Sequence, residues 1–290
     1  MRCRPSRSRR PSWRGHGAGR LAWVAVSVGV WLLTMVVAQG QMGPRSPVPA
    51  GAEPVDWTLG TVQSHGQATA PPAGGERAAR RAAAVAASVH TARQQLLETL
   101  GQLRLTAERT IADTVQGTPE KQQALAGLVA EAEVIATRYL PQDTVESTVQ
   151  LPVFGRLTTL FWPDTSTAAA APGASPAGAV YTGIIIDARG LAVHPALFPR
   201  LVDESGQTLY APAQVDASIA AQRGYVVYAS AVDNPQLEVR VGKQPLIFRA
   251  RRVLGPARVD VVVKQPDAAQ LQGSEALRFL LMQCRVVIVG

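Results

Sequence analysis

One stretch of the sequence carries side chains of the types that acid–base or hydrolytic chemistry uses. Residues 181–206 read YTGIIIDARGLAVHPALFPRLVDESG, and their candidate groups are Asp187, His194, Asp203 and Glu204. A histidine near carboxylates could act as a general base that one acid orients, and the same set could ligate a metal ion. A periplasmic hydrolase that uses Asp187, His194 and Asp203 is therefore one functional hypothesis.

The sequence lacks the further motifs that these chemistries need. It contains no G-x-S-x-G nucleophile elbow, no D-x-D-x-D-G calcium loop and neither of the glycine-rich phosphate-binding motifs. Cys3 and Cys284 are its only cysteines, and Cys3 would be removed with a leader. One remaining thiol cannot form an internal disulfide or a zinc site. We therefore expect no catalytic residue, no metal and no cofactor.

Turn chemistry explains the first charged residues of this stretch without a substrate. The run Ile184–Ile186 is uninterrupted and β-branched, which is typical of a strand covered on both faces. Asp187 can then accept hydrogen bonds from backbone N–H groups, Arg189 can pair with a carboxylate, and Gly190 permits a positive φ. We interpret these three as turn residues, with a possible role in an interaction.

The next segment, ALFPRLVDESGQTLY, predicts a β-hairpin. Asp203 would begin its tight turn and Gly206 would end it. Outside this stretch, Phe161 and Trp162 in LFWP could anchor a partner or close the core of their own domain, and both interpretations stay open.

The basic character of the chain is concentrated at its start. The sequence has 29 basic and 21 acidic residues, but seven arginines lie in the first twenty positions with no acid among them. The rest of the chain is nearly neutral, which argues against a nucleic-acid-binding protein. Residues 21–38 then form an apolar run without a charge, and Ala38 could precede a signal-peptidase cleavage site.

We therefore expect a signal peptide at residues 1–38, with Gln39 as the mature N-terminus. The apolar run is barely long enough to span a bilayer, so an uncleaved inner-membrane anchor is the alternative. In that case the membrane contact would be made by the N-terminal segment only.

The remaining sequence predicts an α+β protein with two small domains, each a mostly antiparallel sheet with packed helices. The expected segments are a flexible linker at 39–75, a first domain at 76–162, a second linker at 163–178 and a second, β-rich domain at 179–290. In the first domain we expect a long helix from Glu76, a strand at 104–115, a helix from Thr118 and then a hairpin. In the second domain the expected strands are 180–187, 196–203, 225–231, 238–241, 246–253, 258–264 and 284–289, and the expected helices are 216–221 and 267–281.

Several segments together resemble one known family. TGIIIDARGL, PALFPRLVDESG, GKQPLIFRARRV and FLLMQCRVVIV, with the upstream ARRAAAVAASVHTARQQLLETLGQLRL and VESTVQLPVFGRL, are similar to the bacterial twenty-kilodalton outer-membrane lipoprotein family. That family includes flagellar envelope and basal-body-associated proteins, and the resemblance covers most of residues 76–290. It implies a non-enzymatic envelope protein and brings no catalytic residues. This chain lacks the lipid-bearing cysteine after its apolar run.

The resulting hypothesis is an exported, non-enzymatic assembly or interaction module, and the family resemblance implies support of the flagellar basal body or motility. Its partners would be envelope or flagellar proteins, and it could also self-associate. We expect it in the periplasm or associated with the outer membrane, and the alternative is a structural protein anchored in the inner membrane.

Overall fold

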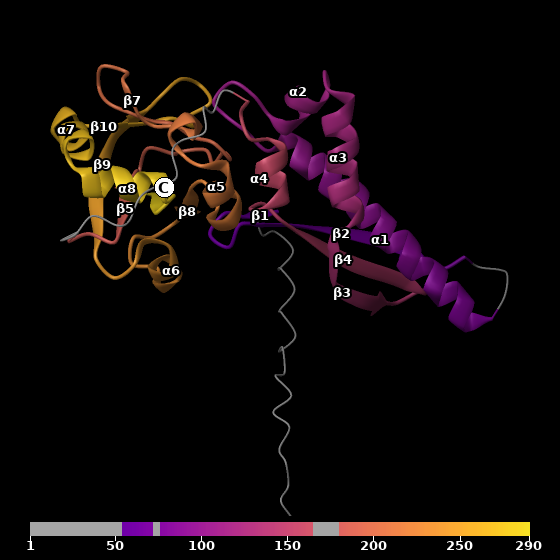
Figure 1. The fold of residues 1–290 in the computed structure, drawn as a ribbon. Helices are drawn as coiled ribbons and strands as arrows, with labels where there is room; N and C mark the ends of the chain where they lie inside the picture. Colours follow the sequence, from indigo (N-terminus) through magenta and orange to yellow (C-terminus); the bar gives the residue numbers. More distant parts are fainter. Residues whose placement is uncertain (1–53, 72–75, 165–179) are drawn as a thin grey trace, which may run out of the picture. The chain divides into compact units, whose positions relative to one another are not determined.

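The computed structural model describes residues 54–71, 76–164 and 180–290 (Figure 1). The expected signal peptide and most of the two expected linkers lie outside these residues. The described part is an α+β protein with two sheets and packed helices, as the sequence predicts. Among the described helices, none combines the length and the apolar character that crossing a bilayer requires.

The first sheet has four strands in the order β1-β2-β4-β3, and every pair in it is antiparallel. Its strands are β1 (Val55–Asp56), β2 (Thr61–Thr69), β3 (Glu133–Leu140) and β4 (Thr144–Pro152). The expected hairpin is confirmed as β3 and β4, which pair in register from Ala136↔Thr148 to Leu140↔Thr144. A bulge between Val134 and Ala136 bends the start of β3.

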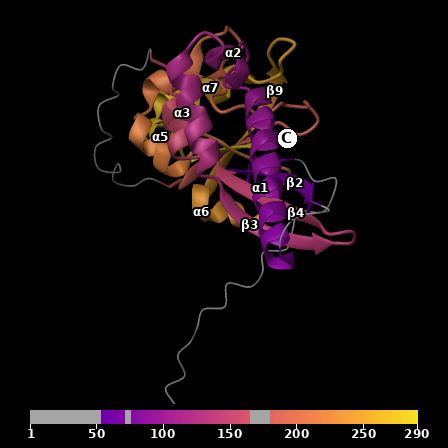
Figure 2. The same cartoon turned by 90° about the vertical axis from the view of Figure 1, so that its right-hand side faces the viewer.

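One long helix covers this sheet. Helix α1 (Arg77–Gln102) lies along β2 and β4 (Figures 1 and 2). It buries a stripe in which residues recur every fourth position: Ala84, Ser88, Ala92, Leu96 and Leu100. The expected helix is confirmed. The small residues at the start of this stripe let the helix backbone approach the sheet closely.

The prediction of a flexible linker at 39–75 was wrong over the later part of this range, because β1 and β2 lie within it. On β2, the residues that face inward are Val62, Ser64 and Gly66. Ser64 donates a hydrogen bond from Oγ to the Ala92 carbonyl oxygen at 2.6 Å. Apart from Val62, the buried face of this strand is made by small and polar residues, so the sequence shows no hydrophobic alternation there.

The prediction of a strand at 104–115 was also wrong. Only an isolated bridge joins Arg104 to Thr110, and the short helix α2 (Ile111–Val115) follows. Thr110 caps this helix: its Oγ1 accepts from the Asp113 N–H at 3.2 Å, and the Asp113 carboxylate accepts from the Thr110 N–H at 2.8 Å. This reciprocal capping favours a helix start over a continued strand. Helix α3 (Pro119–Ala130), which is confirmed, and α4 (Arg156–Leu160) complete this half.

The second sheet has seven strands in the order β7-β6-β10-β9-β5-β11-β8. They are β5 (Gly183–Asp187), β6 (Leu201–Val202), β7 (Thr208–Tyr210), β8 (Val227–Ala229), β9 (Pro245–Val253), β10 (Val261–Val263) and β11 (Val286–Val289). Four of its six pairs are parallel, and only β9/β10 and β6/β7 are antiparallel. The expected mostly antiparallel order therefore describes the first sheet and not the second.

Helical crossovers explain the parallel pairs, because parallel neighbours need a long connection. The connections contain α5 (Ala217–Arg223), α6 (Glu238–Val241), α7 (Gln265–Gly273) and α8 (Glu275–Met282), with 3-10 turns at Pro212–Gln214 and Pro235–Leu237. Residues 238–241, expected as a strand, form α6, which ends at Gly242 with φ +71°. The helix expected at 267–281 is divided at Ser274, which caps α8.

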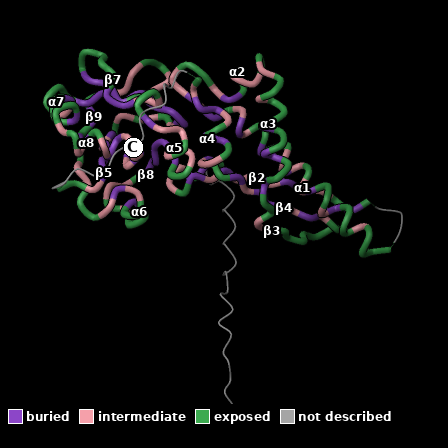
Figure 3. The backbone as a smooth tube through the Cα atoms, in the orientation of Figure 1, coloured by how far each residue is buried: buried purple, intermediate pink, exposed green. Residues whose placement is uncertain are grey.

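Buried side chains run through both halves of the described chain. One cluster includes Val62 on β2, Leu96 on α1, Trp162 after α4 and Ile288 on β11. Figure 3 shows buried stretches in purple in both halves of the described chain, whereas β3 and the outer face of α1 are largely exposed.

Candidate functional site

The carboxylate of Asp187 is held by its own turn. Asp187 is the last residue of β5, and its carboxylate accepts hydrogen bonds from the Arg189 N–H at 3.2 Å, from Nε at 2.8 Å and from Nη2 at 2.8 Å. Gly190 completes the turn with φ +82°. The hydrogen bond with Arg189 is the largest cause that lowers the pKa of Asp187 to about 2. This group is ionised at neutral pH, and both of its oxygens accept hydrogen bonds from the adjacent arginine.

Asp203 is held in the same way in the turn between β6 and β7. Its Oδ1 accepts from Ser205 Oγ at 2.7 Å and from the Gln207 N–H at 2.8 Å, and the residue is buried. Gly206 has φ +89°. The Ser205 hydrogen bond is the largest cause that lowers the pKa of the Asp203 carboxyl. The predicted hairpin and its turn are therefore present in the structure.

His194 lies exposed in the loop after β5, and its backbone N–H donates to the Arg258 carbonyl oxygen at 2.9 Å. None of the hydrogen bonds or ion pairs found in the described residues joins His194 to Asp187 or Asp203. The same part of the chain has no group of three or more histidine, cysteine or acidic side chains placed to hold a metal ion. The structure does not assemble the residues of the hydrolase hypothesis into one hydrogen-bonded set.

Phe161 and Trp162 are buried, with 3% and 8% of their surface exposed. The Trp162 ring meets Phe198 edge-on at 5.3 Å between centroids, and Tyr225 at 6.1 Å. The structure therefore supports the interpretation in which these two aromatic side chains close the core of the protein. They are not accessible as anchors for a partner in this conformation.

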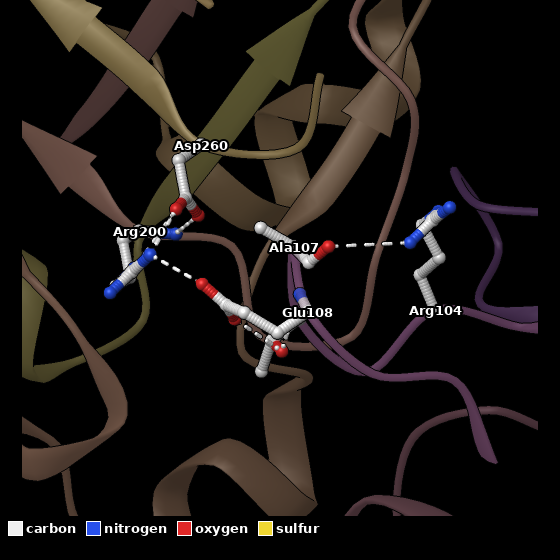
Figure 4. A network of polar contacts seen from close by, with 6 residues as sticks. Arg104, Ala107, Glu108, Arg200 and Asp260 are labelled. Carbon is white, nitrogen blue, oxygen red and sulfur yellow. Dashed lines mark hydrogen bonds and ion pairs between the residues drawn. The ribbon is translucent and has the colours of Figure 1, made fainter. Parts of the chain in front are cut away.

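A polar network missed by the sequence analysis connects three distant segments (Figure 4). Arg200 donates to Asp260 from Nη2 at 2.6 Å and to Glu108 from the same atom at 2.9 Å. Arg104 donates to the Ala107 carbonyl oxygen in the loop that presents Glu108. Next to it, the Leu197 and Phe198 N–H groups donate to the carbonyl oxygens of residues 104 and 105. No local pattern reveals these partners, because they are 60 to 92 positions apart.

The most accessible strand of the described chain is β3. It pairs with β4 on one side, and its other edge has no strand partner among the described residues. Val134, Tyr139 and Leu140 are 42%, 62% and 37% exposed. The Arg81 guanidinium lies over the Tyr139 ring, 5.4 Å from its centroid. This edge combines free backbone groups with exposed apolar and aromatic side chains, which are the requirements for adding a strand from a partner.

Comparison with known families gives a match for the C-terminal part of the chain. Residues 183–290 match the family model of the second domain of Treponema pallidum Tp0624. The match begins at the first residue of β5 and includes all seven strands of the second sheet. No curated protein sequence matches the chain.

Proposed function

We propose that this protein is a non-enzymatic assembly module of the bacterial cell envelope, and that it binds its partner by strand addition at the β3 edge. The exposure of β3 is the observation that carries this proposal. The expected signal peptide supports export to the periplasm or outer membrane. The resemblance to outer-membrane lipoproteins supports an envelope or flagellar protein as the partner.

The composition of β3 favours pairing. Exposed edges are usually protected by lysine, proline or short length. This strand has eight residues, EVIATRYL, with neither lysine nor proline. Its charged residues are Glu133 and Arg138, and Arg138 lies 3.7 Å from Glu146 on the neighbouring strand β4. The stretch after the bulge, from Ala136 onward, offers a regular edge for a partner strand.

Site-specific crosslinking in cells tests the proposal. A photoreactive residue at Tyr139 should give a defined adduct with one envelope protein, whereas the same residue at Gln95, exposed on α1, should not. The substitution Tyr139→Lys should abolish binding of the partner strand without unfolding the chain. Equal adducts from both positions, or none from Tyr139, would contradict strand addition at this edge. An adduct between two copies of the chain would make the partner a second copy.

Deletion of the gene tests the flagellar setting. Reduced swimming, with incomplete basal bodies in electron micrographs of the same cells, is the expected result if the module supports flagellar assembly. Normal swimming with intact bases would remove the flagellar setting and leave other envelope assemblies. Sequencing the N-terminus of the purified protein distinguishes the exported form, which begins at Gln39, from the inner-membrane-anchored alternative.

A further inference from the structure

Three arginines from different elements line one pocket. Arg223 ends α5, Arg240 lies on α6 and Arg285 precedes β11, and they surround a cavity of about 450 Å³. The amides of Gln222 and Gln236 also line it, and none of the described residues that line it is acidic. Its volume is within the range of small-molecule sites.

The charges of these arginines are not neutralised by carboxylates. None of the three takes part in any ion pair found among the described residues. Glu238, on the same helix as Arg240, is 3.8 Å from Lys243 instead. Grouped arginines without acidic partners attract anions.

Two of the guanidinium groups are held in place by neutral backbone groups. Arg240 donates to the carbonyl oxygens at the end of α5: Arg223, Gly224 at 2.8 Å and Tyr225 at 3.1 Å. Arg285 donates from Nη1 to the Thr182 carbonyl oxygen at 2.8 Å. These bonds fix the positions of the two side chains and leave their positive charges uncompensated, which is the preorganisation that a binding site needs.

Capping of α5 explains only part of this arrangement. A cation at a helix C-terminus is favourable, so Arg240 has a structural role as well. That role does not account for Arg285, which lies just before β11, or for exposed Arg223 at the same cavity. Burial is the main cause that lowers the pKa of Arg240, and the charge of Arg223 acts in the same direction.

The wall of the pocket is built by a close packing contact. The Phe154 ring lies where a side chain at Gly224 would be, with its Cδ1 2.5 Å from the position of an added Cβ. Gly224 has φ +81°, a conformation that other residues rarely adopt. Phe154 and the 96% exposed Val239 give the pocket apolar surface beside its positive charge.

We propose that this pocket binds a phosphate-bearing ligand, with the phosphate oxygens received by Arg223, Arg240 and Arg285. Planar guanidinium forks suit a phosphate group, which offers several oxygens to more than one arginine. The apolar surface next to the arginines would accommodate the group that carries the phosphate. A soluble phosphate compound and a phospholipid headgroup share this chemistry, and the measurements below distinguish them.

Calorimetric titration of the purified full chain with inorganic phosphate, at constant ionic strength, tests the site. We expect saturable binding that weakens about tenfold or more in Arg223→Gln and in Arg285→Gln, because each change removes charge-assisted hydrogen bonds. Arg252→Gln, an equal charge change on exposed β9, should bind as the unmodified chain does. Arg223 is exposed and its side chain makes no hydrogen bond to the described residues, so its substitution should leave the unfolding midpoint unchanged.

The second arm uses dihexanoylphosphatidylglycerol below its micelle concentration, with the phosphatidylcholine analogue for comparison. If the phosphatidylglycerol lipid binds more tightly than inorganic phosphate, and Arg223→Gln abolishes this binding, the ligand is a phospholipid headgroup. Binding of inorganic phosphate alone would support a soluble phosphate compound. The proposal is overturned if neither probe binds, or if Arg252→Gln weakens binding as much as Arg223→Gln does.

Discussion

Arg200 holds the carboxylate of Asp260, which is almost fully buried. Its Nη2 and Nε lie 2.6 and 2.9 Å from Oδ2, and its backbone N–H donates to Oδ1 at 2.9 Å. Asp260 is 1% exposed, whereas the Arg200 side chain is 44% exposed. The hydrogen bond to Asp260 is the largest cause that raises the pKa of Arg200. The buried carboxylate therefore depends on one arginine that reaches it from the surface (Figure 4).

Removal of this arginine side chain should destabilise the fold strongly. Arg200→Ala leaves the Asp260 charge buried without a cation, and we expect a loss of about 3 kcal/mol in the free energy of unfolding, measured with urea. Glu108→Gln removes only the exposed end of the network and should cost less than about 1 kcal/mol. Similar losses of unfolding free energy in the two variants would contradict the larger contribution that we expect from the buried Arg200–Asp260 pair.

Gly66 should not tolerate even a methyl group. An added Cβ would lie 2.2 Å from the Ala92 nitrogen and 2.3 Å from the Ser88 carbonyl oxygen, both in the α1 backbone. Gly66→Ala must therefore move the helix away from the sheet, and we expect a loss of about 3 kcal/mol in urea unfolding. Gly127→Ala is the matched control: it lies in α3 with nothing within 4 Å of the added Cβ, and it should stabilise by about 0.5 to 1 kcal/mol.

Elements with a strong local signal were predictable from the sequence. The sequence predicted a long helix from Glu76 and a second helix from Thr118, and these are α1 and α3. The run Ile184–Ile186 predicted β5, and the turn residues Asp203 and Gly206 predicted the β6/β7 hairpin. In each case the residues that form the element also carry the information that specifies it.

The missed features depend on distant partners. Strand β2 buries Ser64 and Gly66 because α1 lies against them, so its burial is not visible in its own composition. The parallel pairing of β5 with β9 and β11 depends on crossovers, and valine and isoleucine runs suit either strand direction. The arginine pocket joins positions 223, 240 and 285, which no local motif relates.

The hydrogen bonds of the Asp187 turn should make the free energy of unfolding depend on pH in the acid range. Its pKa in the folded protein is about 2, below the ordinary 3.8, so the stabilisation is complete above about pH 4 and is lost as pH falls towards 2. Arg189 is 56% exposed, so solvent screens its charge and the effect on stability is small. Arg189→Gln should raise the Asp187 pKa in an NMR titration and flatten urea stability between pH 4 and 2, whereas Arg252→Gln should do neither. An unchanged Asp187 pKa in Arg189→Gln would contradict the assignment.

Trp162 and Tyr139 should separate folding from binding. Trp162 packs edge-on against Phe198 and Tyr225 in the core, so Trp162→Ala should cost about 3 to 5 kcal/mol in urea unfolding. Tyr139 is 62% exposed on β3, so Tyr139→Ala should change stability by less than about 1 kcal/mol and still reduce crosslinking to the proposed partner. A stable Trp162→Ala variant that no longer binds its partner would contradict this assignment and show that Trp162 belongs to the interaction surface. It would also remove the β3 edge as the site of binding if Tyr139→Ala kept its partner.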